Sequence, residues 1–182
     1  MASMQPSEFR LVSSVEELPE PSDAALQFIA AWKAARRRNL VPLKRNFDPL
    51  SIPHLLPDIF MYRYDPESDS FVCRLAGERV NASWGYPITG KTSREILGEA
   101  DAPMIEEIWH RILTTPLLHY GNAERLSGNL LYAAERVVAP LADDEGDVTI
   151  ILGLSRYSLG GLTRITARAI LPNAVHIDCR DL

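Results

Sequence analysis

The sequence is poor in the residues that build disulfide frameworks, and it has no long hydrophobic run. Its 182 residues include only two cysteines, Cys73 and Cys179, far apart in the chain. A reducing compartment is the simpler interpretation of so few cysteines. No apolar run approaches the roughly 18 residues of a membrane-spanning helix, and the N-terminus lacks the basic and apolar regions of a signal peptide. We therefore expect a cytoplasmic protein with no membrane span.

Motifs of catalysis are also missing. The chain has no Gly-x-Ser-x-Gly, His-Glu-x-x-His or P-loop motif, and Gly153 with Gly160-Gly161 does not form a dinucleotide fingerprint. The net charge of −5 argues against a general nucleic-acid-binding protein. Acidic residues gather in the turn sequences 65–69 and 143–147 rather than in a pocket. We therefore expect no enzyme, and a cone-shaped fold of the ketosteroid-isomerase kind is the less favoured alternative.

The histidines and cysteines do not indicate a metal or haem site. The histidines show no tight metal-ligand spacing and are His54, His110, His119 and His176. Only His110 falls on the predicted middle helix, where a haem ligand would be expected, and it lies off the apolar stripe. Cys73 falls in a predicted strand and is interpreted as a buried structural thiol rather than a flavin-reactive one. Haem and flavin are disfavoured, and the cofactor, if there is one, is unknown.

What the sequence does contain is the composition of a globular domain, with 46% hydrophobic and 24% charged residues. An N-terminal helix is predicted for residues 23–38, after a cap at Ser22 or Asp23. Its apolar side chains Phe28, Ile29 and Trp32 are too large to leave in water. They must pack on the chain's own sheet or on a second copy, and we expect a homodimer in which Trp32 is buried.

The remaining pattern alternates short strands and helices. Strands are predicted at 59–64, 70–76, 117–126, 130–141 and 148–157, and helices at 78–84, 92–97 and 102–113. The last three strands follow one another at the spacing of an antiparallel meander. This order predicts a flexible leader (1–21), a flanking helix and connection (22–57), a core (58–159) and a C-terminal extension (160–182).

Two kinds of side chain are candidates for a pocket. Arg74 and Arg136 are charges in strands of a mostly apolar sheet, so each needs an acidic partner at the rim or an anionic ligand. Four aromatic residues can line a cavity or simply fill the core: Trp84, Trp109, Tyr120 and Tyr132.

Several short motifs resemble those of a bacterial PAS-like family of stand-alone domains. In chain order they are Trp32, Val-Pro-Leu-Lys-Arg-Asn-Phe-Asp-Pro (41–49), Leu-Leu-Pro (55–57), Phe-Val-Cys-Arg-Leu-Ala-Gly (71–77), Thr-Gly-Lys (89–91) and Glu-Arg-Val-Val-Ala-Pro-Leu (135–141). The resemblance covers residues 24–157. It implies an α+β fold with a five-stranded antiparallel sheet and short helices on one face.

The resemblance also implies a sensory or signalling module. With no output domain evident in the sequence, such a module would act through a protein partner or its own dimer. A small apolar or anionic ligand would occupy the space around Trp84 and Trp109. An unliganded scaffold, with the cavity filled by side chains, is the alternative.

Overall fold

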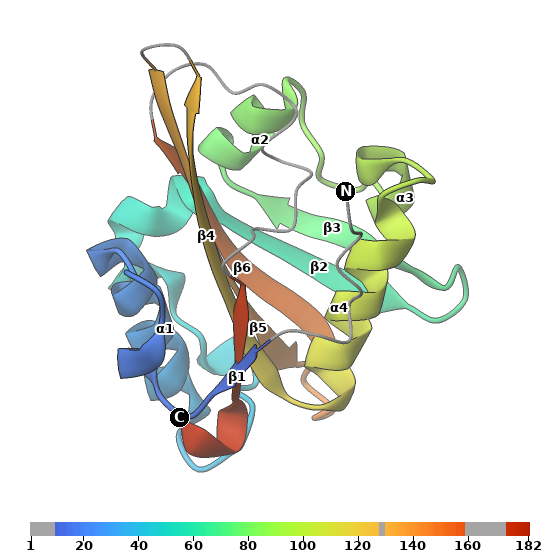
Figure 1. Ribbon diagram of the computed structural model, residues 1–182. Helices are drawn as coiled ribbons and strands as arrows, with labels where there is room; N and C mark the ends of the chain where they lie inside the picture. Colours follow the sequence, from blue (N-terminus) through green and yellow to red (C-terminus); the bar gives the residue numbers. More distant parts are fainter. Residues whose placement is uncertain (1–9, 128–129, 159–173) are drawn as a thin grey trace.

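A computed structural model describes residues 10–127, 130–158 and 174–182, and a single sheet runs through it. Helix α1 lies on one face of this sheet, and α2, α3 and α4 lie on the other (Figure 1). The α-helices are α1 (Asp23–Arg36), α2 (Glu78–Trp84), α3 (Ser93–Leu97) and α4 (Ala102–Thr114). Short 3-10 helices occupy Val15–Glu17, Lys44–Asn46, Pro49–Ser51, Pro53–Asp58 and Cys179–Asp181.

The sheet has seven strands within the described residues, so the prediction of five is wrong. The strands are β1 (Arg10–Val12), β2 (Ile59–Asp65), β3 (Ser70–Ala76), β4 (Leu117–Ser127), β5 (Leu130–Ala142), β6 (Val148–Ser158) and β7 (Val175–Asp178). Their order across the sheet is β1-β7-β4-β5-β6-β2-β3. The five predicted strands correspond to β2–β6, and β4, β5 and β6 form the expected antiparallel meander.

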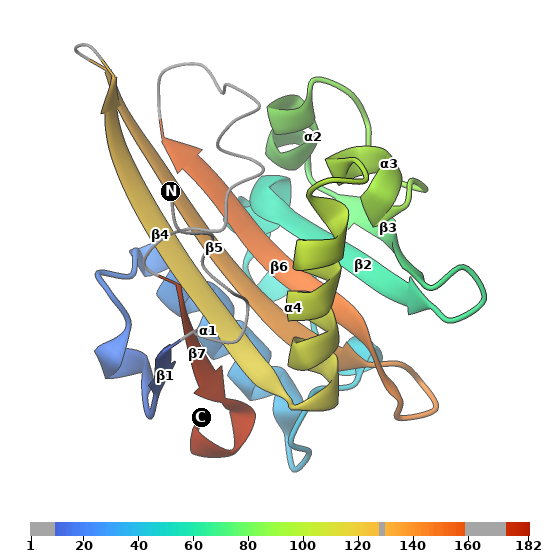
Figure 2. The same cartoon turned by 45° about the vertical axis from the view of Figure 1, so that its right-hand side comes forward.

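The two additional strands lie beyond β4, where Figure 2 shows β7 beside it. Strand β1 pairs with β7 in parallel, so the sheet is not purely antiparallel as predicted. At three and four residues, these strands are too short to show the alternation that identifies a strand in a sequence. Residues 1–9 of the predicted leader, residue 159 at the end of the predicted core and residues 160–173 of the predicted extension lie outside the described residues. The four-part division of the chain stays a prediction.

Both faces of the sheet are buried, which divides the core in two. One apolar cluster joins α1 to side chains such as Val137, Ala139 and Leu152. The other joins α2, α3 and α4 to side chains such as Val138 and Ile151. Because successive residues of a strand point to opposite faces, neighbouring residues of β5 enter different clusters.

Helix α1 is held on the sheet by its own apolar side chains. Phe28, Ile29 and Trp32 are each at most 2% exposed within the single chain. The Trp32 indole Nε1 donates to the carbonyl oxygen of Pro140, at 2.8 Å. Their burial therefore does not require the second copy that the sequence analysis invoked for Trp32.

The end of β3 lies against the connection that precedes β2. The Gly77 amide donates to the carbonyl of Ile59 at 2.8 Å. A Cβ atom added to Gly77 would lie 2.2 Å from the carbonyl oxygen of Pro57, which is far inside contact distance. Glycine is required here because backbone atoms approach from the side where a side chain would stand.

A pair of buried histidines joins β7 to the rest of the sheet. His119 of β4 lies directly opposite His176 of β7, and His119 Nδ1 is 2.9 Å from His176 Nε2. Burial, followed by nearby Arg111, lowers the pKa of His176 to about 4. Burial, then His176 and Arg136, lowers the pKa of His119 well below its ordinary value. The folded protein therefore holds both rings neutral.

Replacing Gly77 tests the close approach to Pro57. We expect Gly77→Ala to lower the free energy of unfolding by about 1–3 kcal/mol, because the new methyl group must displace backbone. Urea unfolding followed by circular dichroism measures this. Gly146→Ala, at a positive φ with open space around its Cα, serves as a control for backbone strain without a clash. If Gly77→Ala were as stable as the wild type, the backbone at Pro57 would have to move aside without cost, which would contradict the prediction.

The histidine pair predicts a loss of stability in mild acid. The unfolded chain takes up protons near pH 6.5, whereas folded His176 does so only near pH 4, so stability falls as the pH drops between these values. The shift corresponds to roughly 2–4 kcal/mol at about 1.4 kcal/mol per pH unit. Urea unfolding at pH 7.5 and at pH 5 measures the part of this loss that occurs above pH 5, which is about 2 kcal/mol.

We expect His176→Gln to lose part of this pH dependence. The exposed His54 provides a matched control, and His54→Gln should keep the wild-type profile. Equal profiles for all three proteins would contradict the role given to the buried pair.

Candidate functional site

A cavity of about 70 Å³ lies between the sheet and helices α2 and α4. Its wall is apolar over most of its extent and polar at one end. The lining residues are Phe60, Tyr62, Val80, Trp84, Leu97, Ile105, Ile108, Trp109, His119, Arg136, Val138, Ser155 and Tyr157. They come from β2, α2, α3, α4, β4, β5 and β6, so the space depends on how the helices sit on the sheet.

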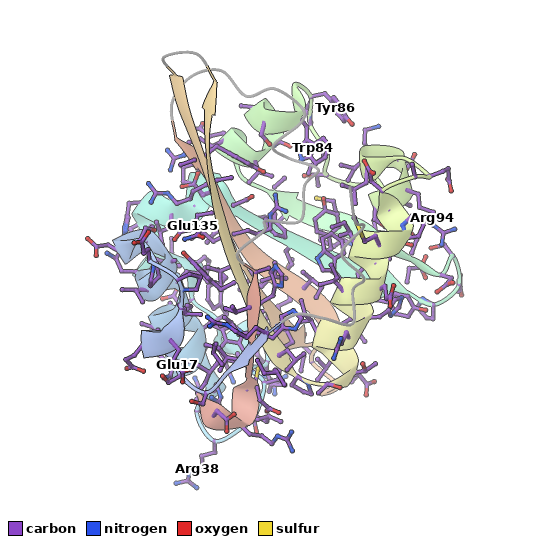
Figure 3. All side chains as sticks on the ribbon, viewed as in Figure 1. Glu17, Arg38, Trp84, Tyr86, Arg94 and Glu135 are labelled. Carbon is purple, nitrogen blue, oxygen red and sulfur yellow. The ribbon has the colours of Figure 1, made fainter. Side chains whose placement is uncertain are left out.

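Aromatic rings make up much of the apolar wall. The rings of Tyr62 and Trp109 lie 4.6 Å apart, centroid to centroid, and those of Phe60 and Tyr62 lie 5.8 Å apart. Such contacts hold the rings in fixed relative orientations. Burial raises the pKa of Tyr62 well above its usual range, so its phenol stays protonated. Trp84 of α2 completes the wall, on the face of the sheet that α2, α3 and α4 cover (Figure 3).

The polar end is a chain of hydrogen bonds across β5 and β6. Arg136 Nε donates to Ser155 Oγ at 3.3 Å, and Arg136 Nη2 donates to Tyr157 OH at 3.0 Å. Ser155 Oγ donates to the same phenol oxygen at 3.2 Å. His119 lines the cavity beside this chain. The described lining residues include no Asp or Glu, so the guanidinium supplies their one full charge.

The residue next to Arg136 serves a different part of the protein. Glu135 points to the opposite face of the sheet, where Figure 3 shows it on the side of α1. Its carboxylate accepts the backbone N–H of Ser22 at 2.8 Å and the Ser22 hydroxyl. Ser22 is the N-cap of α1, and its hydroxyl oxygen accepts the N–H of Ala25. Strand β5 thus links the cavity wall to the beginning of α1.

Three of the predicted pocket residues meet at the cavity, namely Trp84, Trp109 and Arg136. Tyr120 lies on the other face, where its hydroxyl donates to Glu135 at 3.0 Å. Burial, followed by the Glu135 charge, raises the pKa of this phenol.

The other two predicted pocket residues do not join this group. Arg74 is exposed and borders a separate surface hollow that Lys44, Arg63 and Asp143 also line. The side chain of Tyr132 lies outside the described residues.

Most other lining residues were not predicted. The alternation of Phe60 with Tyr62, of Arg136 with Val138, and of Ser155 with Tyr157 places each pair on one face of its strand. That signal is present in the sequence, but choosing the face requires knowing which side the helices cover.

His110 and Cys73, which were considered as haem and flavin sites, lie on this side of the sheet among packed side chains. The His110 ring stands 4.7 Å from the Tyr64 ring and 5.0 Å from the Phe71 ring, and it does not line the cavity. Cys73 is fully buried, and burial raises the pKa of its thiol to about 11, which makes it a poor nucleophile.

Clusters of metal-ligating side chains and membrane-spanning helices are both absent from the described residues. Among the described residues, no group of three or more His, Cys, Asp or Glu side chains is arranged to hold a metal ion. Within the same part of the chain, no helix has the length and apolarity needed to cross a bilayer.

Comparison with solved structures finds PAS domains and proteins that contain them. The PAS domain of Bordetella pertussis BvgS has a TM-score of 0.43 and 16% identity, covering 62% of this chain and 88% of that one. A sensory box sensor histidine kinase from Vibrio cholerae has a TM-score of 0.41 and 14% identity, covering 62% and 92%.

A third structure is that of Vibrio cholerae VqmA in complex with ligand and DNA. Its TM-score is 0.43 and its identity 16%, covering 59% of this chain and 49% of that one. Because all three TM-scores lie below 0.5, these likenesses support no functional argument. No curated protein matches the chain.

The sequence family provides the assignment. The PAS_5 family, described as PAS domain, matches residues 21–156, which span α1, the helices around the cavity and strands β2–β6. This match confirms the resemblance seen in the short motifs of the sequence. The chain belongs to the PAS_5 family of PAS domains.

Proposed function

We propose that this PAS domain is a sensory module that holds a small molecule in the cavity and passes its presence through β5 to α1. The observation that carries the proposal is the pair of neighbours Arg136 and Glu135. Arg136 forms part of the cavity wall, and Glu135 holds the N-cap of α1. The signal then leaves by contact with a protein partner or a second copy of the chain.

The composition of the cavity supports a ligand site. Small-molecule sites are concave and mostly apolar, with a few polar groups that converge. Here aromatic and aliphatic side chains surround one cluster formed by Arg136, Ser155 and Tyr157. The described lining residues include no carboxylate, so they do not supply the acid–base pair that a cone-shaped isomerase would need.

The size of the cavity favours small occupants and keeps the scaffold alternative open. An apolar cavity of roughly 150 Å³ accepts benzene, and this one has about half that volume. A larger molecule would have to displace α2 or α4. If side chains fill the cavity in the working protein, the domain is an unliganded scaffold that acts through its surfaces.

Coupling to α1 follows from the strand geometry. A shift of β5 that moves Arg136 also moves Glu135, because the two share a peptide bond. Glu135 is the anchor for both the N–H and the hydroxyl of Ser22. Loss of a helix N-cap costs about 1 kcal/mol, so a small strand movement is enough to change the stability of the first turn of α1.

Xenon pressure with NMR detection tests whether the cavity accepts a small molecule. We expect saturable chemical-shift changes at Val138, Ile108 and the indole of Trp84, because xenon fills apolar cavities of this kind. Ile108→Phe fills the space from α4 and should abolish the changes, whereas Leu75→Phe, on the exposed edge of β3, should retain them. No saturable change in the wild type would favour the scaffold.

Association with a second copy remains part of the proposal, but Phe28, Ile29 and Trp32 of α1 are already buried within the single chain. We expect Trp32→Ala to lower the free energy of unfolding by about 3–5 kcal/mol, because it removes a fully buried indole and its bond to Pro140. Urea unfolding and sedimentation of the same samples measure stability and assembly together. A variant of unchanged stability that changes from dimer to monomer would instead place Trp32 in an interface.

A further inference from the structure

The hydrogen bonds at the polar end of the cavity determine which way a proton points. The Tyr157 oxygen accepts from both Arg136 Nη2 and Ser155 Oγ, at 3.0 and 3.2 Å. A phenol oxygen that accepts from two donors directs its own O–H away from both. The guanidinium polarises this chain, which strengthens the terminal hydroxyl as a donor. The polar end therefore suits a ligand atom that accepts hydrogen bonds.

The charge of the residues that line the cavity favours one kind of ligand acceptor atom. Arg136 is positive, and its guanidinium lies in the cavity wall beside the hydroxyl groups of Ser155 and Tyr157. His119 is neutral because burial and the neighbouring His176 and Arg136 lower its pKa. An oxygen with a full negative charge gains more from such a wall than a neutral carbonyl oxygen does, because Coulomb attraction to the guanidinium is added to the hydrogen bond.

The apolar part of the cavity wall indicates the chemistry of the rest of the ligand. Rings and aliphatic side chains, including Tyr62, Trp109 and Val138, surround the rest of the cavity. An inorganic anion would leave these groups without contact, whereas a short alkyl chain would cover them. The volume of about 70 Å³ leaves space for only a few non-hydrogen atoms.

We infer that the cavity binds a small monocarboxylate of the size of acetate, propionate or pyruvate. The carboxylate meets Arg136 and the hydroxyl of Tyr157, and the alkyl end lies against Trp109 and Val138. This inference rests on the proposed function, because it names the ligand class of the same cavity.

Titration with propionate and its neutral analogue propionamide, followed by NMR of the lining residues, tests the inference. Propionate should bind at least ten-fold more tightly than propionamide. Arg136→Met should weaken propionate binding ten-fold or more and weaken propionamide binding much less. Tyr157→Phe, which removes only the hydroxyl, should weaken propionate several-fold. Tyr64→Phe removes a hydroxyl that contacts Asp69 away from the cavity and should bind propionate like the wild type.

Xenon binding, measured on the same samples, distinguishes failure of the carboxylate inference from failure of the proposed function. Xenon binding without propionate binding would overturn the carboxylate assignment and leave the cavity as a ligand site. Equal affinity for propionate and propionamide, or full affinity in both Arg136→Met and Tyr157→Phe, would also overturn it. If neither xenon nor propionate shifts the lining residues, the proposed function fails together with the inference.

Discussion

The structure depends on one constraint, a sheet that is buried on both faces. Strand β5 lies near its middle, and its period of two sends successive side chains into two separate cores. Val137 and Ala139 support α1, while Val138 faces the helices of the other side. A shift of this strand by one residue would send Arg136 into the core under α1 and Glu135 to the cavity side, so its register is strongly specified.

The same alternation of side chains along β5 places polar groups on both faces of the sheet. Glu135 reaches the N-cap of α1 and Arg136 reaches the cavity because they are neighbours in a two-faced strand. On β4, His119 likewise lines the cavity and also hydrogen-bonds His176 of β7. Two strands of the cavity wall therefore hold elements outside it, because β5 holds α1 through Glu135 and β4 holds β7 through His119.

Much of this architecture could be predicted from the sequence. The bounds expected for residues 70–76 and 78–84 are those of β3 and α2, because turns and glycines mark their ends. Strands β1 and β7 could not be predicted, since so few residues carry no periodic signal. The histidine pair joins positions 57 residues apart in the sequence, a contact that only the fold creates.

The candidate site shows the same limit. Trp84, Trp109 and Arg136 were chosen for their chemistry and line the cavity, whereas Tyr120, for which cavity and core were both open, lies in the core on the other face. Alternation shows that Tyr120 and His119 face opposite ways, and only the position of the helices shows which of them faces the cavity.

The most direct measurement is the affinity of the cavity for xenon in the wild type and in Ser22→Ala, by NMR at Val138. Because coupling between two sites is reciprocal, weakening the N-cap of α1 must change binding at the cavity if β5 connects them. The account predicts a difference of about five-fold or more, the lower end of typical coupling. Equal affinities in two folded proteins would contradict it.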